Sequence, residues 1–258
     1  LGAFFSLLFI PLVYFLVPET VTFLERKRPD NALERIQAIM RRLGHSVPES
    51  LPSPETRVVA PVGIPSLFKP GLAPITCILL FAYLGNVGTY YYFVKWIPTI
   101  VSDFGYSSSE ATTVLGIISL GGVIGSIGLG IVARFLPIRP LMVLCLISAA
   151  IGVAVFPHFT DTLQSMKLIG FFAGLFIFAA ISGFFGLFAV SYPSSLLGSG
   201  SGLVLGIGRG GAVLGPMIPG FLFAAGVALQ SIAIIMASGS FLAGLAVMFL
   251  RPQAEPSS

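Results

Sequence analysis

The sequence predicts an all-α polytopic membrane protein. Only 9% of its 258 residues are charged and 55% are hydrophobic, whereas soluble domains carry roughly 25% charged residues. Its mean hydropathy is +0.98, and several apolar runs exceed the ~18 residues that mark a membrane-spanning helix. A membrane β-barrel would instead show short segments of alternating polarity, so we expect a bundle of spanning helices.

Composition divides the chain into four predicted parts. Residues 1–17 are apolar and are interpreted as a truncated spanning helix, because the chain begins inside them. Residues 18–71 form a basic loop, residues 72–250 hold six helices, and residues 251–258 form a tail. Such a chain is expected to be a fragment of a longer membrane protein.

The basic loop is predicted to contain one amphipathic helix and a linker. The stretch "PDNALERIQAIMRRLGH" places Leu33, Ile36 and Met40 on one apolar stripe, and Asp30 or Asn31 can cap its start. This helix either lies along the membrane surface or is a solvated linker helix. Six prolines between residues 46 and 71 then predict a linker without regular structure.

Six helices are expected to follow the linker. Their predicted ranges are 72–97, 109–133, 141–156, 168–192, 200–225 and 229–250. Eight of the 14 Lys and Arg residues lie between Arg26 and Lys69, so the positive-inside rule places residues 18–71 in the cytoplasm. Alternate crossings then put the turn with Arg134 and Arg139, and the C-terminal tail, on the same side. This distribution indicates membrane topology, and the lipid bilayer rather than nucleic acid is the expected partner.

The fifth predicted span contains the stretch "GIGRGGAVLGP", in which Gly206 begins a G-x-G-x-x-G spacing typical of dinucleotide-binding loops. That motif needs a preceding strand and an acidic residue about 20 positions later. The sequence has no Asp or Glu between Thr162 and Ala254. We therefore interpret the glycines as helix-packing residues. Gly202, Gly206 and Gly210 recur every four residues, Gly211 and Gly215 form another such pair, and we expect these small residues to bring helices together.

Arg209 in the same stretch is the main candidate functional residue. At about 100° per residue it lies nearly in line with Gly202 and Gly206, so we expect it to project into the bundle near the bilayer middle. A charge at that depth costs roughly 2.5 kcal/mol or more. No acidic residue lies within any apolar span of the chain. Arg209 is therefore either a structural arginine or a residue that binds a substrate carboxylate through its planar guanidinium.

Other polar and aromatic residues in the spans suggest a ligand cavity. Asn86 and Tyr90 are four residues apart, and Phe178 and Ser182 share a stripe of a Phe-rich span. These side chains could supply hydrogen bonds and stacking rings to a ligand. The alternatives are an interhelical hydrogen bond at Asn86 and the general abundance of Phe in membrane helices.

The sequence offers no basis for an enzyme. It contains no nucleophile–base–acid set, metal-ligand cluster or phosphate loop, and its two cysteines, Cys77 and Cys145, lie in apolar spans without metal-ligand spacing. We expect no bound cofactor and no metal site.

Three stretches resemble the aromatic acid:H+ symporter family of the major facilitator superfamily. "YPSSLLGSGSGLVLGIGRGGAVLGPMIPG" is similar to that family's segment joining helices ten and eleven. "VPETVTFLERKRPDNALERIQAIMRRLG" resembles the segment after its sixth helix, and "VKWIPTIVSDFGYSSSEA" resembles the end of its seventh. The resemblance covers nearly the whole chain as helices six to twelve. It implies a C-terminal six-helix bundle preceded by the last helix of the N-terminal bundle.

This resemblance implies proton-coupled uptake of an aromatic or other organic carboxylate by alternating access in the bacterial inner membrane. The coupling ion would be a proton, and the family's paired acids on the first helix fall outside this chain. Helices one to five are therefore an expected partner. A sugar or organic-cation porter of the same superfamily is the alternative within transport. A non-transporting membrane scaffold, or the membrane half of an enzyme, is the second alternative.

Two positions depart from the family pattern. The superfamily usually carries an Asp before the arginine of the turn after helix eight, but Ala133 precedes Arg134 here. The family also usually has a basic residue after Tyr192-Pro193, where this chain has Ser194. We expect the gating charge pair at Arg134 to be absent.

Overall fold

The computed structural model describes residues 31–42, 50 and 63–250. The chain forms two compact units, Leu1–Ala60 and Pro61–Ser258. The described helix of the first unit is α3 (Ala32–Arg42), on which Ile36 is buried and Leu33 and Met40 are half-buried. The predicted helix in residues 1–17, the capping Asp30, most of the proline-rich linker and the tail 251–258 lie outside the described residues.

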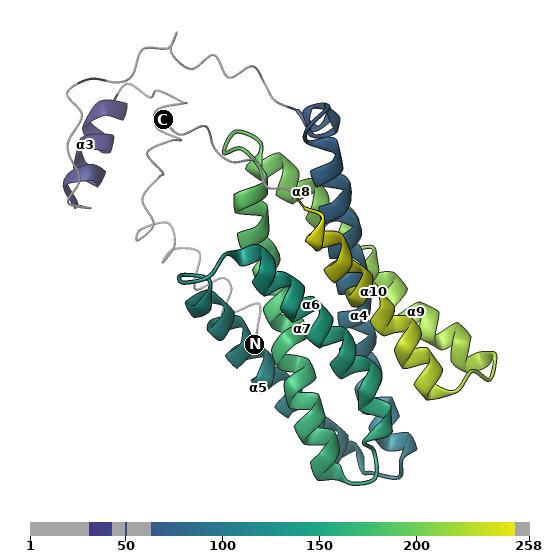
Figure 1. Ribbon diagram of the computed structural model, residues 1–258. Helices are drawn as coiled ribbons and strands as arrows, with labels where there is room; N and C mark the ends of the chain where they lie inside the picture. The colour runs from purple at the N-terminus through teal and green to yellow at the C-terminus, as the bar shows by residue number, and fades with distance from the viewer. Residues whose placement is uncertain (1–30, 43–49, 51–62, 251–258) are drawn as a thin grey trace. The chain divides into compact units, whose positions relative to one another are not determined.

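The second unit contains six helical segments long and apolar enough to cross a membrane. They appear in Figure 1 as α4 (Ala73–Asp103), α5 (Ser108–Val132), α6 (Ile138–Val155), α7 (Leu163–Ser191), the pair α8 (Leu197–Gly208) and α9 (Gly211–Ala224), and α10 (Leu229–Met248). The described part of the chain contains no strand. The predicted all-α polytopic fold class is therefore confirmed.

Two details differ from the predicted elements. Residues Ile64–Phe68 form a short 3-10 helix, η2, inside what was predicted to be an irregular linker. Helix α4 continues six residues past its predicted end, because Pro98 lies inside it without ending it. A proline removes one helical hydrogen bond, which is tolerated in spanning helices whose neighbours hold the backbone in place. A second short 3-10 helix, η3 (Phe156–His158), ends α6.

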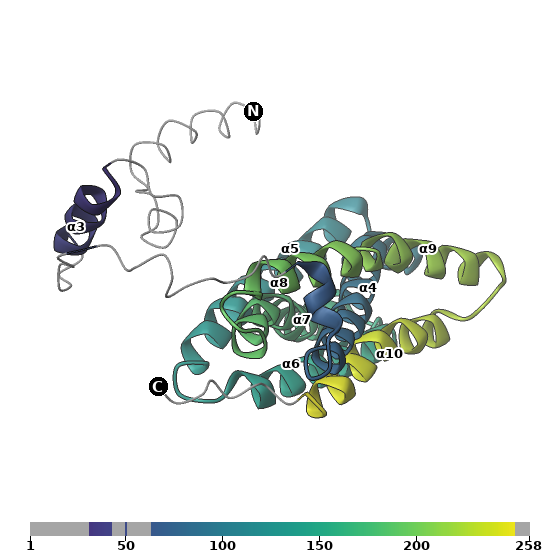
Figure 2. The same ribbon diagram turned by 90° about the horizontal axis from the view of Figure 1, so that it is seen from above.

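Helix α4 is the central element of this unit. It contacts α5, α7, α8, α9 and α10, and Figure 2 shows it among these helices from above. Residues from α4 occur in both hydrophobic core clusters. Side chains on its different faces are therefore directed toward different neighbours, which decides which of them can share a site.

Several helix pairs meet through glycines. Gly125 of α5 lies against the backbone of Leu175 in α7, and Gly174 of α7 lies against the backbone of Ile118 in α5. A methyl group at Gly85 of α4 would lie 2.6 Å from the carbonyl oxygen of Gly239 in α10. These positions have no room for a side chain, as expected for small-residue packing between membrane helices.

The fifth span is broken near its middle. The amide of Gly210 donates to the Ile207 carbonyl at 2.9 Å, and that of Ala212 donates to the Arg209 carbonyl at 2.8 Å. Both bonds join residues three apart, so the regular four-residue pattern of the α-helix is interrupted there. Helix α8 ends and α9 begins at this point, with Arg209 between them.

Among the predicted packing glycines, the pair Gly211 and Gly215 brings this span to α4. A methyl group at Gly211 would lie 2.5 Å from the Leu84 carbonyl oxygen, and one at Gly215 would lie 2.6 Å from that of Gly88. At Gly202 and Gly206 it would meet nothing within 4 Å. Helix α8 instead buries Gly200, Val204 and Gly208.

The prediction is thus wrong for Gly202 and Gly206 within the described chain. A methyl group at Gly210 would make only an ordinary van der Waals contact with α4, at 3.7 Å from a Leu84 methyl. Two glycine-containing stripes run along this span at similar spacing. Periodicity alone identifies both, whereas the neighbouring helix decides which one is buried.

Candidate functional site

Arg209 lies at the break between α8 and α9, near the midpoint of the span Leu197–Ala224. Its side chain is exposed on the described unit. The prediction that it projects into the bundle interior is therefore wrong for the described residues. The reason is its position one residue after the buried Gly208, which turns it about 100° from the buried face of α8.

A tyrosine on α4 is the described partner of Arg209. The hydroxyl of Tyr83 lies close enough to the guanidinium to interact with its charge. The Tyr83 ring is buried against Gly208 and against Phe184, with the two ring centroids 5.1 Å apart and nearly perpendicular. Packing of the ring thus fixes the direction of the hydroxyl toward Arg209.

The surroundings of Arg209 favour an anion. Within residues 63–250 the carboxylates are Asp103, Glu110 and Asp161, and all three lie in turns or at helix ends rather than near mid-span. The guanidinium therefore has no described carboxylate at the same depth.

Tyr90 and Phe178, two predicted site residues, are in contact. Their ring centroids lie 5.0 Å apart at an interplanar angle of 86°, and Tyr90 makes a similar contact with Tyr91. Ser182 lies one turn beyond Phe178 on α7, and its hydroxyl donates to the Ser126 hydroxyl of α5 at 3.0 Å. The structure therefore brings Tyr90, Phe178 and Ser182 to one side of the bundle.

Asn86 does not join this group. Its Oδ1 accepts a hydrogen bond from the Ser240 hydroxyl of α10 at 2.9 Å, and its side chain is fully buried. Next to it, the Thr89 hydroxyl donates to the Met236 carbonyl at 2.6 Å. Of the two interpretations of Asn86, the structure shows the interhelical hydrogen bond. Its Nδ2 finds no partner among the residues described.

Arg134, in the turn between α5 and α6, and Arg139, at the start of α6, have different environments. Arg139 Nε donates to the Val247 carbonyl at 3.2 Å, and its Nη2 donates to the Met248 carbonyl. These are among the final carbonyls of α10, and the negative end of a helix attracts a cation. Arg134 is exposed in the turn.

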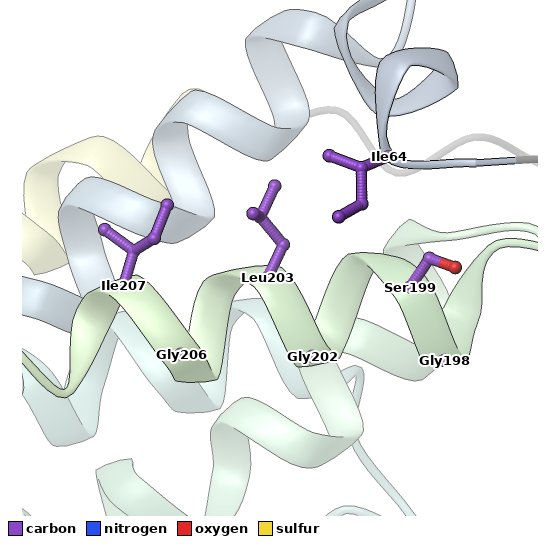
Figure 3. Close-up of a pocket in the computed structure, with 7 residues that line it drawn as sticks. All are labelled: Ile64, Gly198, Ser199, Gly202, Leu203, Gly206 and Ile207. Atoms are coloured by element: carbon purple, nitrogen blue, oxygen red, sulfur yellow. The ribbon is translucent and has the colours of Figure 1, made fainter.

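An apolar groove of about 420 Å³ lies between η2 and α8, apart from Arg209. In Figure 3, Leu203 and Ile207 extend from α8 on the side where Ile64 lies, while Gly202 and Gly206 add no side chain to it. A second groove, of about 310 Å³, lies between α6 and α7 and is also lined mainly by apolar residues. Neither groove is lined by any of the five predicted substrate residues. The part of the chain that the structure describes has no cluster of three or more His, Cys, Asp or Glu that could hold a metal.

The sequence did not single out Tyr83, Tyr91 or Ser126. Tyr83 lies seven residues before Tyr90, a spacing that repeats one helix face and could have indicated it. Ser126 is a polar residue within an apolar span. The contact of Arg209 with Tyr83 depends on how α8 packs against α4, which the sequence does not reveal.

Six apolar helical segments long enough to cross a bilayer define a multi-pass α-helical membrane protein. The model of the Major Facilitator Superfamily matches residues 1–209. The chain belongs to this superfamily.

The chain is similar to several curated transporters of aromatic acids. It is 30% identical to the 3-(3-hydroxy-phenyl)propionate transporter of Escherichia coli, over 72% of this chain and 46% of that protein. It is 28% identical to the gallate transporter of Pseudomonas putida, over 96% of this chain and 55% of the relative. It is 25% identical to the 4-hydroxybenzoate transporter of Pseudomonas aeruginosa, over 96% and 56% respectively. The chain thus spans about half the length of these relatives, and the predicted resemblance to them is confirmed.

Proposed function

We propose that this chain forms part of a carrier that takes up an aromatic carboxylate together with a proton. The relatives are transporters of 3-(3-hydroxyphenyl)propionate, gallate and 4-hydroxybenzoate. The observation that carries the proposal is Arg209, an exposed cation at the centre of a broken span, beside the hydroxyl of Tyr83. A planar guanidinium can bind a carboxylate through two parallel hydrogen bonds.

A group of aromatic residues on α4 and α7 supports an aromatic substrate. Tyr90 and Phe178 meet edge to face, and Tyr91 lies against Tyr90. Such rings can pack against the ring of a bound acid, a contact worth about 0.5–1.5 kcal/mol beyond burial. Discontinuous spans near the bilayer midplane are also a common place for substrate sites in transporters, where half-helix N-termini point at anionic groups.

The alternative within transport is a sugar or organic-cation porter. Arg209 would repel a cation at this position. A sugar needs many hydrogen-bonding partners, and the described residues around Tyr90 and Phe178 are mainly aromatic. These properties favour the aromatic acid.

Uptake in cells that express the full-length carrier containing this chain tests the proposal. We expect labelled 4-hydroxybenzoate to enter and to be displaced by excess unlabelled benzoates, while hexoses and quaternary amines leave uptake unchanged. Displacement by a hexose or a quaternary amine, but not by benzoates, would instead support the alternative porter.

Proton coupling and orientation belong to the same proposal. The chain has no acidic residue near the middle of a span to carry the proton, so the acids would lie on the half that the relatives have beyond this chain. Uptake should fall when a protonophore collapses the proton gradient, and uptake that continues unchanged would exclude proton coupling.

We further propose location in the bacterial inner membrane, with residues 18–71 in the cytoplasm. A cytoplasm-specific reporter fused after Arg251 should then be active, and an inactive one would contradict this orientation.

A further inference from the structure

The hydroxyl pair Ser126–Ser182 differs from the other serines of the spans. Ser119 and Ser201 donate to carbonyls one turn earlier in their own helices, at 2.9 and 2.6 Å. Ser182 instead donates across the α5–α7 contact to Ser126, at 3.0 Å, and its side chain is exposed. The interhelical bond between Ser240 and Asn86 is fully buried. The Ser126–Ser182 pair is therefore an interhelical polar contact that a ligand can reach.

The pair retains hydrogen-bonding capacity. Once Ser182 has donated, the Ser126 hydroxyl still has its own proton, and the Ser182 oxygen still has lone pairs. Neither is engaged in another hydrogen bond within the described part of the chain. A phenol hydroxyl donates one hydrogen bond and accepts others. It can accept from Ser126 and donate to Ser182, so both serines would bind the same oxygen.

The position of the pair suits the far end of an aromatic acid. Ser182 follows Phe178, the residue in contact with Tyr90, by one turn. It also precedes Phe184 by two residues, or about 3 Å along the axis of α7. Phe184 packs against Tyr83, and Tyr83 interacts with Arg209. Ser182 thus lies along α7 between Phe178 and Phe184, the residues that contact Tyr90 and Tyr83 of α4.

We propose that Ser126 and Ser182 bind the ring hydroxyl of a hydroxylated aromatic acid whose carboxylate is held at Arg209. This inference rests on the proposed function and specifies its substrate class. A ring without a hydroxyl leaves the serine pair bonded to itself, so benzoate would be accepted but would gain nothing from the pair.

Competition by 3-hydroxybenzoate, 4-hydroxybenzoate and benzoate in the full-length carrier tests this site. We expect the wild type to bind at least one hydroxybenzoate more tightly than benzoate. Replacing both serines, Ser126→Ala and Ser182→Ala, should weaken that hydroxybenzoate about tenfold, the value of roughly one good hydrogen bond, and leave benzoate inhibition unchanged. Unchanged benzoate inhibition also shows that the variant is folded.

The matched control is Ser119→Ala, which removes a hydroxyl of α5 that bonds only to its own helix. It should alter neither inhibition constant. Equal weakening of benzoate and hydroxybenzoate by the double variant, or no effect on either, would overturn the serine site while leaving aromatic acid transport intact. A wild type with no preference for hydroxylated acids would do the same. A wild type that transports no aromatic acid would instead contradict the proposed function itself.

Discussion

Among single residues, Tyr83 and Arg209 link two helices that are more than 100 positions apart in the sequence. Tyr83 is held by Phe184 and Phe188, whose ring centroids lie 5.1 and 6.2 Å from its own. Its hydroxyl therefore has a fixed position beside a guanidinium that is otherwise exposed. We infer that Tyr83 orients Arg209 rather than taking part in transport directly.

Removing that hydroxyl gives the first prediction. In the full-length carrier, Tyr83→Phe should raise the half-saturation concentration for 4-hydroxybenzoate about three- to tenfold with little change in maximal rate, because Arg209 loses the neighbouring hydroxyl that orients it. The phenylalanine keeps the ring contacts with Phe184 and Phe188. Concentration-dependent uptake measures the effect, and Tyr106→Phe, in the turn before α5, is the control. An unchanged half-saturation concentration would contradict an orienting role.

Residue periodicity had mixed success in predicting these contacts. The four-residue spacing placed Phe178 and Ser182 on one face, and the structure places Tyr90 against Phe178. The same spacing grouped Asn86 with Tyr90, but α4 is surrounded by helices and Asn86 turns to α10. A face shared on one helix is not a shared site when several neighbours surround that helix.

At the scale of elements, the close approach of α9 to α4 depends on Gly211 and Gly215. Both glycines face carbonyl oxygens of α4, so the backbones are in direct contact. The exposed Gly202 and Gly206 on α8 serve no such purpose among the described helices.

Adding a methyl group to one glycine of each stripe distinguishes the buried stripe from the exposed one. We expect Gly211→Ala to destabilise the protein by about 1–3 kcal/mol, because the new methyl would overlap backbone atoms that cannot move aside. Gly206→Ala should be neutral or slightly stabilising, since alanine favours helix over glycine. Thermal unfolding in detergent, followed by size-exclusion chromatography, measures both. Equal stability of the two variants would contradict the close backbone contact between α9 and α4 at Gly211.

The end of α10 provides the next prediction. Arg139→Gln should lower stability by about 1 kcal/mol, because the Val247 and Met248 carbonyls lose a charged donor at the helix C-terminus. Arg134→Gln, in the turn before α6 and exposed, should have no measurable effect. The same thermal assay compares them. A larger loss of stability with Arg134→Gln than with Arg139→Gln would show that Arg134, and not Arg139, supplies the stabilising charge.

At the scale of the whole molecule, the membrane fold was predictable from hydropathy. A bilayer requires long apolar helices whatever their tertiary contacts, and the six described spans lie close to their predicted ranges. The break at Arg209 was not predicted, because Gly210 fits equally well inside a continuous glycine-rich helix. The exposure of Arg209 likewise depends on which stripe of α8 faces α4.

The chain covers about half of the length of its curated relatives. The proposed site therefore belongs to a carrier that would also contain the half beyond this chain. The relatives' substrates, the mid-span arginine and the surrounding aromatic rings all favour an aromatic carboxylate. Arg209 is the residue on which this proposal depends most.

Uptake of labelled 4-hydroxybenzoate by Arg209→Ala and Arg209→Lys variants of the full-length carrier tests that role most directly, with protein levels in the membrane matched by immunoblot. We expect the alanine variant to fall to background. We expect the lysine variant to keep a small fraction of wild-type uptake, because a lysine supplies charge but not two parallel hydrogen bonds. Wild-type uptake by Arg209→Ala at equal membrane level would contradict carboxylate binding at this site.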